Sequence, residues 1–204
     1  MNTPNKIIGI LALQGDFEAH QKALRECNNT EITLVRTAQE LEQVDALILP
    51  GGESTTIGKL MARIGLDAAI QKRVSTGMPI FGTCAGLILL ANEIEGYPNQ
   101  PTLRLMDITV ARNAFGRQLD SFEADIPFEL NVGDCETVHG VFIRAPYVVT
   151  VSPEVQVIAQ FRERIVGVRQ ANRLGIAFHP ELTADTRIHA YFAKMVAQST
   201  EQRP

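Results

Sequence analysis

Cysteine is scarce in this sequence and is not arranged in pairs. The three cysteines, Cys27, Cys84 and Cys135, are widely separated in the 204 residues and form no C-x-x-C motif. Their odd number and spacing argue against a disulfide framework and give no sign of a zinc site, so we expect no metal. Free thiols fit a reducing compartment, and we therefore expect a cytoplasmic protein.

The chain also lacks a basic surplus and a long apolar run. Its 19 Lys and Arg residues face 23 Asp and Glu residues, a net charge of −4. We therefore expect no nucleic-acid partner, because no excess positive charge is available to neutralise phosphates. The apolar run from Ile7 to Leu13 is too short to cross a bilayer and is not followed by a cleavage-like site. We expect neither a signal peptide nor a membrane partner.

Nucleotide-binding motifs are missing as well. Neither G-x-x-x-x-G-K-[ST] nor G-x-G-x-x-G occurs, which disfavours nucleotide binding, and we expect no cofactor. No linker, repeat or low-complexity segment divides the chain. Residues 1–204 are therefore expected to form a single domain with its core at about residues 7–196.

Apolar runs alternate with helical patterns in the first half of the chain. The expected strands are 7–13, 31–35, 45–49 and the segment before Cys84. The expected helix caps are Asp16, Thr37 in a capping box with Glu40, and Ser54 or Thr55. This alternation predicts an α/β fold, a doubly wound and mostly parallel sheet flanked by helices, with ligands bound beyond the carboxyl ends of the strands.

The pattern changes from Tyr97 onward to loops and alternating strands. The expected strands there are Leu105–Val110, Gly140–Ala145, Val155–Phe161, Ile165–Arg169 and Arg173–Phe178. These short strands predict an antiparallel extension of the sheet, followed by a closing helix over Ala184–Gln198.

The stretch from Gly82 to Gly86 places Cys84 between two glycines with G-x-C-x-G spacing. Such spacing is typical of an elbow between a strand and a helix, which holds a nucleophile in a strained conformation above a sheet. The adjoining helix N-terminus favours the reactive thiolate. The alternative is a buried structural cysteine, and on this pattern alone that alternative is the safer interpretation.

A nucleophilic thiol needs a base and a group that orients the base. His20 fits the polar side of a helix, His139 a loop-like stretch, and His189 the terminal helix. His179 ends a predicted strand, and Pro180 is expected to hold the segment extended, so that His179 and Glu181 project to the same side. A strand-end histidine beside a solvated glutamate is the alternative, and the Cys84 elbow weighs against it.

An oxyanion formed by attack on a carbonyl needs hydrogen-bond donors. The backbone N–H of Ala85, directly after Cys84, is one candidate. The Gly51-Gly52 turn offers a second through the N–H of Gly52. Taken alone, this turn also fits a tight connection between a strand and a helix, or a phosphate cradle.

Several short sequence motifs resemble those of a known protein family. The Gly82–Gly86 stretch together with His179-Pro180-Glu181 resembles the Cys-His-Glu triad of the class I glutamine amidotransferases, whose fold is flavodoxin-like. A narrower resemblance, to the glutaminase subunits of pyridoxal 5'-phosphate synthase, covers nearly the whole chain from Ile7 to Val196. It rests on Leu13-Gln14-Gly15, Leu49 to Thr56, Arg112 to Gln118, Asp120 to Glu123 and Val141 to Pro146.

The resemblance implies a role for each matching residue. Cys84 would be the nucleophile, His179 the acid and base, and Glu181 its orienting carboxylate, with Gly52 and Ala85 as oxyanion donors. It places six residues around bound L-glutamine: Gly52, Glu53, Ser54, Arg112, Ile143 and Arg144. A zwitterion needs a cation for its carboxylate, which Arg112 or Arg144 offers, and an acceptor for its ammonium, which Glu53 offers. Surface salt bridges are the alternative for these charged residues. Phe128–Val138, which includes Cys135, receives no role.

The resemblance also implies a partner. Ammonia would pass to a separate synthase of the (β/α)₈-barrel type that assembles pyridoxal phosphate, whereas this chain would not bind the vitamin. The isolated glutaminase would be poorly active until the synthase docks near Gln14 and Gly51. We expect hydrolase chemistry, and lyase chemistry as well.

Three alternatives remain open. The chain could be a glutaminase subunit of another amidotransferase, such as imidazole glycerol phosphate synthase. It could be a non-catalytic interaction module of the same fold, against which the presence of Cys84, His179 and Glu181 argues. It could also be a thiol peptidase or a chaperone of similar fold, which would have no need of Arg112 and Arg144.

Overall fold

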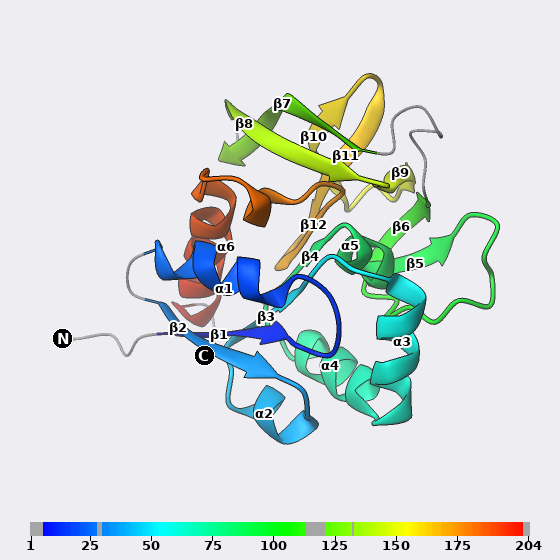
Figure 1. Ribbon diagram of the computed structural model, residues 1–204, viewed down its shortest axis with the longest axis vertical. Helices are drawn as coiled ribbons and strands as arrows, with labels where there is room; N and C mark the ends of the chain where they lie inside the picture. Colours follow the sequence, from blue (N-terminus) through cyan, green and yellow to red (C-terminus); the bar gives the residue numbers. More distant parts are fainter. Residues whose placement is uncertain (1–5, 28–29, 113–120, 132, 202–204) are drawn as a thin grey trace.

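The computed structural model describes residues 6–27, 30–112, 121–131 and 133–201 (Figure 1). The helices are α1 (Phe17–Arg25), α2 (Ala38–Glu42), α3 (Ser54–Arg63), α4 (Leu66–Ser75), α5 (Ala85–Leu90) and α6 (Arg187–Glu201), with a 3-10 turn η2 at Pro180–Leu182. The strands of the first half are β1 (Lys6–Leu11), β2 (Thr30–Val35), β3 (Ala46–Leu49), β4 (Ile80–Thr83) and β5 (Ala91–Ile94). The remaining strands are β6 (Met106–Ala111), β7 (Ser121–Asn131), β8 (Asp134–Ile143), β9 (Tyr147–Val151), β10 (Gln156–Phe161), β11 (Arg164–Gln170) and β12 (Arg173–Ile176).

The first half of the chain forms the predicted parallel sheet. Its strands lie in the order β2-β1-β3-β4-β12, and each neighbouring pair is parallel. Helices α1 and α6 contact each other and β1, whereas α3, α4 and α5 form a second group in which α5 lies against β3, β4 and β12 (Figure 1). The central strands β3 and β4 are buried along their whole length. The doubly wound α/β prediction is confirmed.

The second half extends this sheet with antiparallel strands, as predicted. Beyond β12 the order continues β11-β10-β7-β8, and β9 pairs with both β11 and β6. Three strands were not anticipated from the sequence: β5, β7 and β9. The sequence assigns no role to the segment Phe128–Val138, and its described residues belong to the long hairpin of β7 and β8, where Phe128 pairs with Glu136. His139 belongs to β8, so its assignment to a loop is wrong.

Helix caps differ from the sequence prediction in two places. Thr37 and Glu40 form the expected capping box at α2. Asp16 occupies the N-cap position of α1, but its side chain makes no capping hydrogen bond. At α3 the cap is Glu53, whose carboxylate accepts from the N–H groups of the next turn, and not Ser54 or Thr55.

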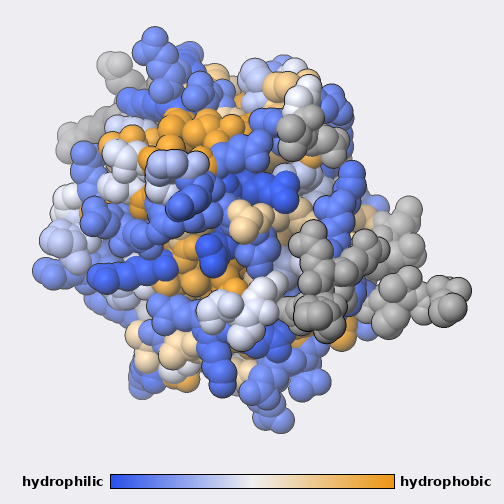
Figure 2. All heavy atoms as spheres, turned by 180° about the vertical axis from the view of Figure 1, so that it is seen from behind, coloured by the Kyte–Doolittle hydropathy of each residue, from blue (hydrophilic) through white to orange (hydrophobic). Residues whose placement is uncertain are grey.

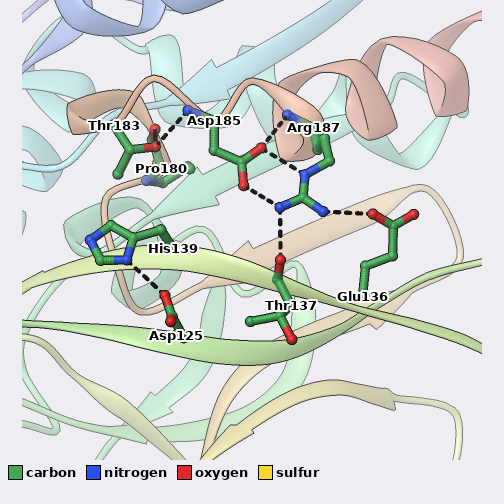
Figure 3. A network of polar contacts seen from close by, with 8 residues as sticks. All are labelled: Asp125, Glu136, Thr137, His139, Pro180, Thr183, Asp185 and Arg187. Carbon is green, nitrogen blue, oxygen red and sulfur yellow. Dashed lines mark hydrogen bonds and ion pairs between the residues drawn. The ribbon is translucent and has the colours of Figure 1, made fainter.

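The hairpin β7–β8 is tied to the start of α6 by polar contacts. Arg187 donates to Asp185 on its own segment and to the Glu136 carboxylate and the Thr137 carbonyl oxygen on β8 (Figure 3). Within the hairpin, the two ring nitrogens of His139 on β8 contact the carboxylates of Asp125 and Glu123 on β7, each at 2.9 Å. Helix α6 begins at Arg187, three residues later than the predicted start at Ala184.

Polar residues cover most of the face opposite to that in Figure 1, and apolar residues gather in small areas between them (Figure 2). The large hydrophobic residues that are most exposed in the described chain are Ile64, Tyr97, Ile143, Val149 and Leu182. None of the described helices is long and apolar enough to cross a membrane.

Candidate active site

Cys84 lies at a sharp turn between β4 and α5. Its backbone has φ 49° and ψ −101°, in the positive-φ region that L-residues rarely adopt. A Cβ on Gly82 would lie 2.5 Å from the carbonyl carbon of Gly86, and a Cβ on Gly86 would lie 2.1 Å from the carbonyl oxygen of Leu49. Only glycine fits at either position. The strained elbow predicted from the G-x-C-x-G spacing is therefore present, with the Cys84 side chain largely buried.

His179 and Glu181 lie together beyond the end of β12. His179 Nδ1 is 2.7 Å from Glu181 Oε1, and the backbone N–H of His179 donates to Val141 of β8 at 2.8 Å. The expectation of a continuously extended segment is wrong, because Pro180–Leu182 form a 3-10 turn. That turn, and not strand alternation, brings the Glu181 carboxylate to the imidazole.

The electrostatics of this pair favour a charged imidazole beside the cysteine. Burial opposes the charge on His179, but hydrogen bonds with Cys84 and Glu181 outweigh it and raise the pKa of His179 to about 10. Burial also opposes ionisation of Glu181, yet the facing His20 and the hydrogen bond from His179 hold the pKa of that carboxyl below its usual range. At neutral pH the arrangement is an imidazolium between a carboxylate and the Cys84 sulfur.

The Gly51-Gly52 turn lies against the histidine. A Cβ on Gly51 would lie 2.3 Å from His179 Cε1. The carbonyl oxygen of Gly51 accepts from the N–H of Asp16 at 3.2 Å, and the N–H of Glu53 donates to Gln14 Oε1 at 2.9 Å. The loop after β1 thus holds the turn after β3 from both sides.

A cavity of about 470 Å³ opens over these groups. Eight of the predicted site residues line it: Gln14, Gly51, Gly52, Glu53, Cys84, Ile143, Arg144 and His179. Ile143 and Arg144 come from the end of β8, and the carbonyl oxygen of Ile143 lies 3.9 Å from Cys84 Sγ. Leu182, which sequence reasoning did not single out, also lines the cavity and is exposed.

Two predicted substrate-binding residues, Ser54 and Arg112, do not line this cavity. Arg112 donates to Thr55, to Gln100 and, at 3.3 Å, to Glu53, and its guanidinium lies over the ring of Tyr97. Gln100 also donates to the buried Ser54 hydroxyl. No motif marks Gln100 or Tyr97, so no signal in the sequence could have found them. Residues 113–120, which continue the Arg112 motif, lie outside the described chain.

Glu53 is fully engaged within the protein. Its two carboxylate oxygens accept from the N–H of Thr55, the N–H and hydroxyl of Thr56, and Arg112. Although burial acts in the opposite direction, the hydrogen bonds from Thr55 and Thr56 lower the pKa of Glu53 to about 2. A carboxylate has about four acceptor sites, and four donors occupy them. The expected role of Glu53 as ammonium acceptor would therefore require one of these donors to be displaced.

The sequence did not predict that two histidines, His20 and His189, would be buried side by side. His20 was expected on a polar helix face, but it is completely buried and lies 3.1 Å from the hydroxyl oxygen of Thr83. His189 was correctly placed in the terminal helix, but it too is completely buried and lies 3.0 Å from His20. Among the residues that the structure describes, no group of three or more His, Cys, Asp and Glu side chains is arranged to hold a metal ion.

The fold and this site define a class. A mostly parallel sheet that carries a strained cysteine elbow, with a histidine and a glutamate from the neighbouring strand, is the arrangement of a class I glutamine amidotransferase. A solved structure described as a glutamine amidotransferase superposes with a TM-score of 0.87 at 48% identity, and covers 93% of this chain and 98% of that one. The structure of PurLQS from Thermotoga maritima, at 21% identity and a TM-score of 0.67, shares the fold over 97% of each chain.

The chain belongs to the SNO glutamine amidotransferase family, whose model matches residues 10–198. It is 52% identical over 191 residues to the pyridoxal 5'-phosphate synthase subunit PdxT of Carboxydothermus hydrogenoformans, covering 94% of this chain and 98% of the relative. It is 54% identical over 185 residues to the PdxT subunit of Pelotomaculum thermopropionicum, covering 91% and 92%. The resemblance to this family is confirmed, and the chain is an enzyme of the glutamine amidotransferase type. The expectation of lyase chemistry is wrong, because the family is one of amidotransferases.

Proposed function

We propose that this chain hydrolyses L-glutamine to L-glutamate and ammonia with Cys84, His179 and Glu181 as its catalytic groups. The observation that carries the proposal is the strained Cys84 elbow facing an imidazole that is itself hydrogen-bonded to a buried carboxylate at 2.7 Å. Thiol hydrolases require a nucleophile, a base and an orienting group in this order.

In the first half of the reaction the Cys84 sulfur attacks the side-chain amide carbon of glutamine. The carbonyl oxygen becomes an oxyanion, which the N–H of Ala85 can stabilise because the first N–H groups of a helix have no intrahelical partner. The N–H of Gly52 is the second proposed donor. The His179 imidazolium gives its proton to the departing nitrogen, so that ammonia leaves and a γ-glutamyl thioester remains on Cys84.

In the second half, His179 is neutral and acts as a base. It accepts a proton from a water molecule, whose oxygen attacks the thioester carbon. The carbon–sulfur bond breaks, glutamate is released, and the proton on His179 restores the starting pair. Glu181 stays ionised and holds the imidazole in the orientation that both steps need.

Substrate selection is proposed to come from the walls of the cavity. Arg144 is in the cavity wall beside Ile143 and offers a cation for the substrate carboxylate. Arg112 acts from behind Glu53, so its proposed contribution is to hold the Glu53 turn as well as to add positive charge. Backbone groups of Gly52 and Glu53 border the same space.

We further propose that the ammonia serves a synthase of the (β/α)₈-barrel type in the cytoplasm, with no cofactor on this chain. The names of the close relatives, which are subunits of pyridoxal 5'-phosphate synthase, support this. Docking near Gln14 would act on the Gly51-Gly52 turn, because Gln14 and Asp16 hydrogen-bond to that turn. We therefore expect the isolated chain to be poorly active.

The test measures glutamate release from glutamine by the wild-type chain, with and without the synthase. We expect activity that rises on addition of the synthase and is abolished in Cys84→Ala. Turnover by Cys84→Ala would refute the nucleophile, and full activity of the wild type alone would refute the coupling. A synthase of another pathway that co-purifies with the chain in place of the expected one would favour another amidotransferase complex.

A further inference from the structure

Behind the His179–Glu181 pair lie two histidines that the mechanism above does not use. His20 of α1 and His189 of α6 are both completely buried, and His20 Nδ1 lies 3.0 Å from His189 Nε2. The other ring nitrogen of His20, Nε2, lies 3.5 Å from Glu181 Oε1. The two rings therefore form a buried connection from the terminal helix to the carboxylate that contacts His179.

Both rings are neutral at neutral pH. Burial lowers the pKa of His20, and it lowers the pKa of His189 to about 3. A neutral imidazole carries one N–H and one lone pair. Because the rings face each other through His20 Nδ1 and His189 Nε2, choosing the tautomer of one ring determines the tautomer of the other.

In the first arrangement His20 carries its proton on Nδ1 and donates to His189 Nε2. His189 then carries its proton on Nδ1, which is buried and has no hydrogen-bond partner among the described residues. An unpaired buried N–H is costly and rare in proteins. His20 Nε2 would also turn a lone pair toward the Glu181 carboxylate.

The second arrangement avoids both costs. Each ring carries its proton on Nε2, so His189 donates to His20 Nδ1, and the orphaned nitrogen of His189 is only a lone pair. His20 then turns an N–H toward Glu181 and toward the Thr83 hydroxyl oxygen at 3.1 Å. Thr83 directly precedes Cys84, so this N–H lies between the elbow and the carboxylate.

We propose that His20 is a positioning residue for Glu181 and that His189 fixes the tautomer in which His20 does this. The N–H edge of His20 stabilises the ionised carboxylate, whose second oxygen, Oε2, is buried without a hydrogen-bond partner among the described residues. It thereby keeps Oε1 directed at His179. The inference rests on the proposed role of Glu181 as the orienting group.

Two substitutions separate positioning from simple packing. In His20→Gln the amide nitrogen can reach the place of Nε2 and still face Glu181 and Thr83, but nothing replaces Nδ1 opposite His189. In His20→Asn the amide reaches only the place of Nδ1, so the contact with His189 is kept and the donor toward Glu181 is lost. The two variants therefore retain opposite halves of the connection.

Glutamate release is measured on each variant in complex with the synthase, and thermal unfolding on each chain. Because the N–H that faces the ionised carboxylate at 3.5 Å is removed, we expect His20→Asn to lower kcat by about tenfold to a hundredfold with little change in KM. We expect His20→Gln to recover most of kcat, whichever of the two variants is the more stable. If kcat follows stability, or if both variants lose activity equally or not at all, the proposal is wrong.

A second measurement needs no variant. Long-range nitrogen–proton correlation spectra of the wild-type chain with ¹⁵N-labelled histidine identify the tautomer of each ring. We expect the proton on Nε2 in both His20 and His189; a proton on Nδ1 of His20 overturns the proposal even if every variant is poorly folded. If the wild-type complex releases no glutamate, the proposed function fails, whereas these spectra still decide whether His20 turns an N–H to Glu181.

Discussion

No space for a side chain exists between Gly51 and His179. The Cβ of an alanine at position 51 would lie 2.3 Å from His179 Cε1, whereas ordinary contacts of this kind begin at 3.4 Å, so the ring or the turn must move by about 1.1 Å. The imidazole is held by its 2.7 Å contact with Glu181, and a shift of this size breaks that geometry. Misplacing a catalytic group by about 1 Å costs about a hundredfold in rate, equivalent to about 2.7 kcal/mol of transition-state stabilisation.

We therefore expect Gly51→Ala to lower kcat for glutamate release about a hundredfold in the presence of the synthase, with about 1–3 kcal/mol of lost stability from overpacking. The rate at which Cys84 is alkylated in the isolated chain should also be lower in Gly51→Ala than in the wild type, because alkylation depends on the His179 charge and not on the synthase. Peptide mass spectrometry measures this rate. Gly65→Ala is the control: its φ is +69° and no atom lies within 4 Å of the added Cβ, so it should cost about 1 kcal/mol of stability and leave kcat unchanged. Wild-type kcat in Gly51→Ala would refute the reasoning.

Three further outcomes are expected. Unfolded histidines bind protons near pH 6.5, whereas burial keeps His20 neutral to lower pH and His189 neutral down to about pH 3. The free energy of unfolding should therefore decrease as the pH is lowered from about 6.5 toward 3, by about 1.4 kcal/mol per pH unit from His189 and in the same direction from His20, as urea titrations can measure. Arg112→Lys keeps the charge but loses the forked contacts to Gln100 and Glu53, so the KM for glutamine should rise about tenfold, consistent with lost binding, with little change in kcat. Arg187→Ala should lower stability by about 1 kcal/mol or less in thermal unfolding, less still at high salt, because its ion pairs are exposed.

The elbow could be predicted because its determinants are adjacent in the sequence. Gly82 and Gly86 stand two residues on either side of Cys84, and the clashes that exclude a side chain there involve the turn itself and the neighbouring strand β3. The parallel sheet was likewise readable from continuous apolar runs, because strands buried on both faces need no alternation.

The buried histidine pair could not be predicted, because it depends on contacts across the fold. His20 and His189 are 169 residues apart in the sequence, and each lies on a helix whose pattern gives no sign of a polar partner within the core. The N-cap of α3 could not be predicted for the same reason, although the residues in contact are closer in the sequence. Glu53, Ser54 and Thr55 can all cap a helix, and the contact from Gln14, 39 residues away, accompanies the choice of Glu53.

The order of strands in the sheet explains how the loop after β1 can act on the proposed active site. The neighbouring strands β1, β3, β4 and β12 all end at one edge, and the segments that follow them supply Gln14, the Gly51-Gly52 turn, Cys84 and His179 in the same spatial order. These segments also contact one another, since Asp16 donates to Gly51 and Gly51 packs against His179. A partner that moves the loop after β1 therefore acts directly on the turn that carries the proposed oxyanion donor, without any change in the core.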